Sequence, residues 1–96
     1  MYIISLTYKT TLENVQKHLD AHIEYLKEQY AAGIFLASGR KVPRTGGIIF
    51  AKADNPETLR KILEKDPFHT NNIADYEITE FIASMTCDEL AFLKEV

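Results

Sequence analysis

Apolar and polar residues alternate at the start of the chain, and this period of two predicts a β-strand over residues 2–8. The residues on one face of this strand are Tyr2, Ile4, Leu6 and Tyr8. From residue 12 onward the apolar positions recur every three or four residues, which predicts an amphipathic helix of about five turns. Its apolar stripe consists of Leu12, Val15, Leu19, Ile23, Leu26 and Tyr30. Thr10 or Thr11 offers an N-cap for this helix, and Gly33 is expected to end it.

Three more segments carry strand signals. Short apolar runs over 34–37 and 48–53 predict a second and a third strand, and the stretch 75–83 alternates again and predicts a fourth. Between the second and third strands, residues 38–47 contain glycines, a proline and three basic side chains. We therefore expect a loop at this point of the chain.

Two further segments carry helix signals. The pair Asn55-Pro56 predicts the start of a second helix, because asparagine is a good cap and proline fits the first helical position. The pair Asp66-Pro67 is expected to end this helix, because the residue before a proline avoids helical dihedral angles. Residues 86–89 match a capping box, so we expect a short terminal helix over 90–96.

The order of these elements, β-α-β-β-α-β, is typical of a ferredoxin-like α+β fold with a four-stranded antiparallel sheet. We expect a single domain over 1–96, in which 84–96 form a C-terminal tail. Both helices would cover one face of the sheet, yet both faces carry apolar residues: Ile48 and Phe50 on one, Ile49 on the other. A second copy of the chain is the simplest cover for the remaining face, so the sequence predicts a homodimer that forms a dimeric α+β barrel.

Composition and charge narrow the classes of function. The 96 residues carry a net charge of -3 and no basic cluster, which argues against nucleic-acid binding. The single cysteine, Cys87, cannot form an internal disulfide, and no apolar run approaches the length of a membrane span. The start of the chain lacks the regions of a signal peptide, so we expect a cytoplasmic protein with no membrane partner. No cysteine and histidine spacing suits zinc, and we expect neither a metal nor an organic cofactor.

Two residues are candidates for acid–base chemistry. His22 lies beside the apolar stripe of the first helix, and a histidine transfers protons near neutral pH. Asp66 stands at the expected end of the second helix, from which it could reach His22 and fix the tautomer of the imidazole. The structural alternatives are a buried histidine bonded to a backbone carbonyl, and an aspartate that only starts the turn before Pro67. His18, one turn before His22, gives only a weak metal signal, and we expect it to face solvent.

The predicted loop between the second and third strands is a candidate for substrate binding. It opens with Ser38, Gly39 and Arg40. Gly39 permits a ligand to approach the backbone closely, and Arg40 and Arg44 would hold a carboxylate or a phosphate. The alternative is a solvated basic loop that binds no ligand. The glycine spacing of a Walker phosphate loop is absent.

Several short motifs, taken in order, resemble the YciI-like family. They are Ala21-His22-Ile23-Glu24-Tyr25-Leu26, Gly33 with Ala37-Ser38-Gly39, Gly46-Gly47, and Lys65-Asp66-Pro67-Phe68. The resemblance extends from Tyr2 to about Ile82. It implies a dimeric α+β barrel and an active site that pairs His22 with Asp66. The family includes relatives that resemble enzymes acting on chlorinated ring diols or lactones.

The chain departs from the family pattern at two positions. Leu19 stands where an arginine is frequent, and Arg40 stands where the family has a proline. Arg40 or Arg44 would then supply the positive charge for an acidic ligand, unless the activity is lost. We expect a small-molecule enzyme that uses His22, oriented by Asp66, for proton abstraction, elimination or isomerisation. The alternatives are a domain that binds a small ligand without chemistry and a protein-interaction domain.

Overall fold

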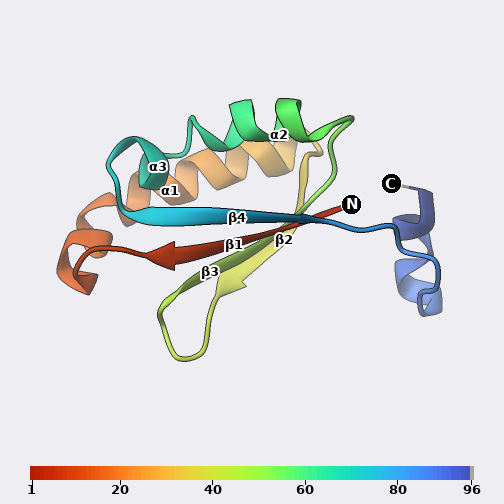
Figure 1. The fold of residues 1–96 in the computed structure, drawn as a ribbon, viewed down its shortest axis with the longest axis horizontal. Helices are drawn as coiled ribbons and strands as arrows, with labels where there is room; N and C mark the ends of the chain where they lie inside the picture. Colours follow the sequence, from red (N-terminus) through yellow and green to blue (C-terminus); the bar gives the residue numbers. More distant parts are fainter. Residues whose placement is uncertain (96) are drawn as a thin grey trace.

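The structure is a computed structural model that describes residues 1–95, and it places a four-stranded antiparallel sheet beneath a layer of helices (Figure 1). The elements are, in chain order, β1 (Tyr2–Tyr8), α1 (Leu12–Ala31), β2 (Phe35–Arg40), β3 (Gly46–Ala51), α2 (Pro56–Leu63), α3 (Pro67–Thr70), β4 (Ala74–Glu80) and a 3-10 helix (Asp88–Glu95). The strands lie in the order β2-β3-β1-β4 across the sheet. The predicted ferredoxin-like α+β fold is therefore confirmed.

The longest helix, α1, begins and ends where capping chemistry favours it. The Oγ1 of Thr11 accepts a hydrogen bond from the backbone N–H of Asn14 at 3.2 Å, as expected of an N-cap. The last helical residue is Ala31, and Gly33 follows it with a φ of 75°. This left-handed value suits a glycine at the end of a helix, so both predicted boundaries of the first helix are confirmed.

The second helix is shorter than predicted, and a separate short helix follows it. α2 ends at Leu63 rather than at Asp66. Asp66 has an extended backbone and caps α3, in which Pro67 occupies the first turn. The prediction that the Asp-Pro pair ends a helix is wrong. The same proline that cannot continue a helix is well suited to begin one, since its missing N–H needs no partner there.

Three strands end at residues that the apolar pattern does not predict. β3 ends at Ala51 rather than at residue 53, because Ala51 pairs with Tyr2, where β1 begins. β2 continues as far as Arg40, because residues 38–40 pair with β3. The loop expected over 38–47 is correspondingly shorter. β4 ends at Glu80 rather than at residue 83, because Glu80 pairs with Tyr2 and β1 offers no earlier strand partner. Hydrogen-bonding partners on the neighbouring strand, rather than apolar side chains, set these ends.

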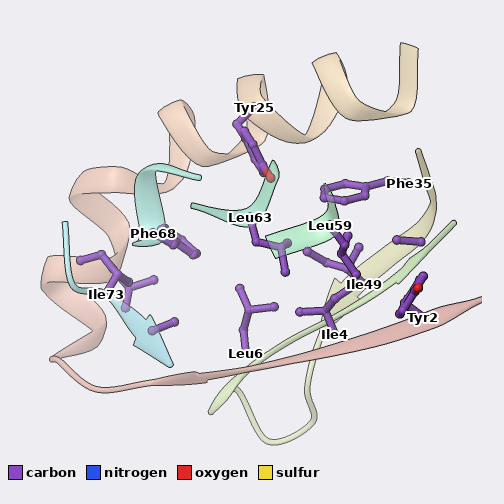
Figure 2. Close-up of a cluster of buried hydrophobic side chains, with 13 residues drawn as sticks. Tyr2, Ile4, Leu6, Tyr25, Phe35, Ile49, Leu59, Leu63, Phe68 and Ile73 are labelled. Atoms are coloured by element: carbon purple, nitrogen blue, oxygen red, sulfur yellow. The ribbon is translucent and has the colours of Figure 1, made fainter. Parts of the chain in front are cut away.

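The hydrophobic core fills the space between the sheet and the helices (Figure 2). Ile4 is fully buried and pairs with Ile49 of β3 and with Ile78 of β4, so apolar side chains form a row across the inner face of the sheet. Leu59 of α2 and Phe68 of α3 close the core from the helix layer. Phe68 thereby places α3 at the side of the core that adjoins the candidate site.

The outer face of the sheet has no helix over it in the part of the chain that the structure describes (Figure 1). Phe50 points to this face and is 37% exposed, and its neighbour on the same face, Ile48, is half-buried. Both faces of the sheet are therefore partly apolar, as predicted. A single chain does not test the predicted homodimer.

The C-terminal tail lies beyond the end of the sheet, apart from the helix layer (Figure 1). It forms the 3-10 helix Asp88–Glu95 in place of the helix predicted over 90–96, and Val96 lies outside the described residues. Met85 and Phe92 are exposed on this tail. Across residues 1–95, no helix has the length and apolarity needed to span a membrane.

Candidate active site

The structure brings the two candidate acid–base residues into direct contact. His22 projects from α1 and is 8% exposed, and Asp66 precedes α3 and is fully buried. The Nδ1 atom of His22 lies 2.7 Å from Oδ1 of Asp66. Two residues separated by 44 positions in sequence thus form a buried pair. An ionised carboxylate at this place selects the imidazole tautomer with its proton on Nδ1.

Asp66 receives hydrogen bonds from two further donors. The backbone N–H of Phe68 donates to Oδ1 at 2.9 Å, which is the capping bond of α3. The hydroxyl of Tyr76, on β4, donates to Oδ2 at 2.6 Å. Asp66 is therefore both a turn-forming residue and the partner of His22, so the two interpretations of this residue hold together. Three donors give a buried carboxylate the partners that it requires.

Aromatic rings fix the plane of the His22 imidazole. The ring of Phe68 stacks on it with centroids 3.9 Å apart and planes within 2° of parallel. The ring of Tyr25, one turn further along α1, lies 6.5 Å away at 26°. The hydroxyl of Tyr25 donates to the backbone carbonyl of Ile62 at 2.7 Å and so ties α1 to α2. The orientation of the imidazole is set by packing as well as by its bond to Asp66.

His22 lines a cavity of about 180 Å³ between α1 and the sheet. Because Nδ1 of the imidazole is occupied by Asp66, Nε2 is the ring nitrogen left for a ligand in this cavity. Most of the wall is apolar and consists of Leu6, Leu19, Ile23, Leu26, Ile49 and Phe68. A base at the wall of a largely apolar cavity is placed to take a proton from a molecule bound there.

Three of the four predicted binding residues line this cavity, namely Ser38, Gly39 and Arg40. Arg40 is exposed, and its guanidinium makes no hydrogen bond or ion pair with any described residue. Arg44 is not among the described residues that line the cavity; its guanidinium bonds the side chain of Gln16 at 3.4 Å. The sequence predicted a loop at residues 38–40, and it is the pairing of these residues with β3 that brings Arg40 to the cavity.

Two tyrosines that the sequence did not indicate as site residues contact the site. Tyr30, near the end of α1, shares a 2.6 Å hydrogen bond with the Oγ atom of Ser38. Tyr76 bonds Asp66 as described above. Alternation placed Tyr76 on a strand, but no sequence signal indicates which residue its hydroxyl meets. Burial, and then the charge of Asp66, raises the pKa of Tyr76 well above its usual value, so this hydroxyl stays a donor.

The remaining histidines do not form a metal site. His18 is half-buried rather than fully solvent-facing, and His69 is exposed with its ring 5.6 Å from that of Tyr76. Within residues 1–95, no group of three or more histidine, cysteine or acidic side chains is placed to hold a metal ion.

Comparison with known protein families assigns the chain to a family. The YCII-related domain matches residues 1–82. The chain belongs to the YCII-related domain family. This assignment confirms the family resemblance seen in the sequence, and the match ends just before the tail. No curated protein matches the chain.

A solved structure of similar fold is the 5-chloro-2-hydroxyhydroquinone dehydrochlorinase TftG of Burkholderia phenoliruptrix AC1100, in complex with 2,5-dihydroxybenzoquinone. The two chains are 16% identical and superpose with a TM-score of 0.71 over 84% of this chain and 93% of the other. At this identity the similarity shows the fold.

Proposed function

We propose that this protein is a small-molecule enzyme in which His22 acts as the general base or acid and Asp66 orients it. The observation that carries the proposal is the 2.7 Å contact between a fully buried carboxylate and an imidazole that lines a cavity. A carboxylate in this position holds the imidazole in one tautomer and stabilises the imidazolium that forms when Nε2 takes a proton. Such a residue contributes roughly 10²–10⁴-fold to a rate.

The proposed reaction begins with transfer of a proton from the substrate to Nε2 of His22. The electron pair left behind then either expels a leaving group, which completes an elimination, or moves within the substrate until His22 returns the proton, which completes an isomerisation. The similar structure belongs to a dehydrochlorinase, which is an elimination enzyme, and this supports the first course. The fold is shared, and fold by itself does not assign a reaction.

The cavity walls indicate which substrates suit the site. Its apolar wall fits a small apolar or aromatic body, and the unpaired guanidinium of Arg40 fits an acidic group on that body. Ser38, held by Tyr30, offers a hydroxyl beside Arg40. Because Arg44 is engaged with Gln16, we assign the recognition of an acidic group to Arg40.

The proposed enzyme is a homodimer whose copies meet through the outer face of the sheet, in a dimeric α+β barrel. The half-exposed apolar side chains of Ile48 and Phe50 support this arrangement, because contiguous exposed apolar area marks an interface. The molar mass in solution, measured by light scattering, tests it. A mass of one chain at micromolar concentration would exclude the dimer.

The decisive experiment is turnover by the wild type and by His22→Gln. The substrates to test are small acidic ring compounds, beginning with 5-chloro-2-hydroxyhydroquinone. Turnover is measured as the release of chloride or as the loss of a carbon-bound proton from NMR spectra. We expect His22→Gln to lose at least about 100-fold in rate with an unchanged fold. His69→Gln is the matched control, because His69 is exposed and outside the cavity.

Turnover by His22→Gln at the wild-type rate would show that His22 is not the general base. Binding of the same compounds by the wild type without any turnover would instead support the alternative of a ligand-binding domain.

A further inference from the structure

A hydrogen-bonded chain crosses the protein from α1 to the edge strand β4. It runs from the imidazole of His22 through the carboxylate of Asp66 to the hydroxyl of Tyr76, with contacts of 2.7 and 2.6 Å. Tyr76 pairs with Leu6 of β1, so it faces the helix layer. The three residues come from three separate elements of the fold, and Asp66 is completely enclosed among them.

The two oxygens of Asp66 have different partners. Oδ1 accepts from the imidazole and from the backbone N–H of Phe68. Oδ2 accepts only from Tyr76 among the residues that the structure describes. Without that hydroxyl, Oδ2 would lack any donor among the described residues, and only the two bonds to Oδ1 would hold the plane of the carboxylate.

We infer that Tyr76 is a positioning residue of the acid–base pair, which acts on His22 through Asp66. This inference rests on the proposed function. The hydroxyl holds the carboxylate in the plane that directs Oδ1 at Nδ1. It also draws negative charge toward Oδ2, which weakens the hold of Asp66 on a protonated imidazole.

Other ionisable groups lie near the His22–Asp66 pair, and they also influence the protonation of the imidazole. Tyr25 faces His22 from α1, and Arg40 and Tyr8 line the same cavity from β2 and β1. Behind Asp66, Tyr76 also lines a separate hollow of about 220 Å³ with Arg60, Glu64 and His69. Of these groups, only Tyr76 donates a hydrogen bond to Asp66, so its removal is the specific change.

The test is a pH titration of the His22 imidazole by NMR in the wild type, Tyr76→Phe and Tyr25→Phe. The second variant is a matched control, because it removes a buried hydroxyl beside His22 that bonds a carbonyl rather than Asp66. We expect Tyr76→Phe to move the titration midpoint upward by about half a unit to one unit, and Tyr25→Phe to move it by less than about 0.2 unit. Equal shifts in both variants would overturn the inference.

A second measurement needs no variant. A hydroxyl proton bonded to a buried carboxylate exchanges slowly and resonates downfield, with a nuclear Overhauser effect to the Asp66 side chain. Its absence from the wild-type spectrum at low temperature would count against the inference even if Tyr76→Phe failed to fold.

Asp66→Asn separates failure of the inference from failure of the proposed function. If Asp66→Asn leaves the His22 midpoint unchanged, the pair is not coupled and the proposed function fails. If Asp66→Asn lowers the midpoint while Tyr76→Phe has no effect, the pair stands and only the role of Tyr76 is wrong. With a substrate in hand, Tyr76→Phe should lower kcat at neutral pH, leave KM within about twofold and shift the acidic limb of the pH profile upward.

Discussion

The two walls of the cavity differ in how they are held. On one side, which we call the dyad wall, His22 lines the cavity, and behind it the fully buried Asp66 bonds both His22 and Tyr76. On the other, the β2 wall, Ser38 and Arg40 are exposed and belong to an edge strand. Hydrogen bonds within the fold position the dyad wall, whereas no described residue holds the guanidinium of Arg40. Under the proposed function, the chemical groups are therefore preorganised on one wall, and the group that would recognise an acidic substrate is left adjustable on the other.

The largest effect on stability should come from the dyad wall. Asp66→Ala removes the cap of α3 and leaves His22 and Tyr76 without their partner, so we expect the free energy of unfolding to fall by about 3–5 kcal/mol. Urea denaturation measures this change. The control is Asp75→Ala, whose exposed ion pair with Lys9 at 3.1 Å should be worth less than about 1 kcal/mol. Similar losses of unfolding free energy in both variants would show that the bonds of Asp66 stabilise the fold no more than an exposed ion pair does.

The second effect is a loss of stability at alkaline pH. Burial raises the pKa of both Tyr76 and Tyr25, and the charge of Asp66 raises them further. An unfolded tyrosine titrates near 10, so above about pH 10 the unfolded chain releases protons that the folded chain retains. The stabilisation is complete below that pH and declines above it, by up to about 1.4 kcal/mol per pH unit for each tyrosine.

Urea unfolding of the wild type between about pH 8 and pH 11, compared with Tyr76→Phe, measures this slope. The variant should start less stable but lose stability less steeply. Parallel slopes in the two proteins would show that Tyr76 ionises as easily in the folded state as in the unfolded chain.

The smallest effect on stability, and a selective effect on binding, should come from the β2 wall. Arg40→Ala should raise KM about tenfold for an acidic substrate, with kcat nearly unchanged and the free energy of unfolding altered by less than about 0.5 kcal/mol. Arg44→Ala is the matched control, because Arg44 bonds Gln16 outside the cavity. Measuring kcat and KM of the two variants shows which arginine recognises the acidic group. A larger rise in KM for the Arg44 variant would reassign the recognition of the acidic group.

The fold followed from the sequence because its signals are local. The alternation over 2–8 and the cap at Thr11 act within a few residues, so the bounds of β1 and α1 were predicted correctly. The ends of β2, β3 and β4 were not, since they depend on where the neighbouring strand has residues to pair. Pro67 was assigned to the end of one helix instead of the start of the next, because both positions tolerate a proline.

The pairing of His22 with Asp66 was expected from the order of the elements and from the family resemblance, whereas the other contacts of the site were not predictable. His22 and Asp66 were singled out separately, one from its place on a helix and one from its place before a proline. Their contact depends on how α1 and α3 pack, which no local pattern encodes. Tyr76 escaped notice because an alternating strand gives a tyrosine an ordinary core role. Its hydroxyl matters only through a residue ten positions away.

Asp66 combines two tasks, since the oxygen that meets His22 also caps α3. In evolutionary terms, this coupling protects the residue for reasons unrelated to catalysis. If the proposed function holds, a descendant that lost the reaction would still need the aspartate in order to fold, whereas the side chain of Arg40, which bonds no described residue, would be free to drift. Arg40 is therefore the more informative position for judging whether a descendant of this chain remains active.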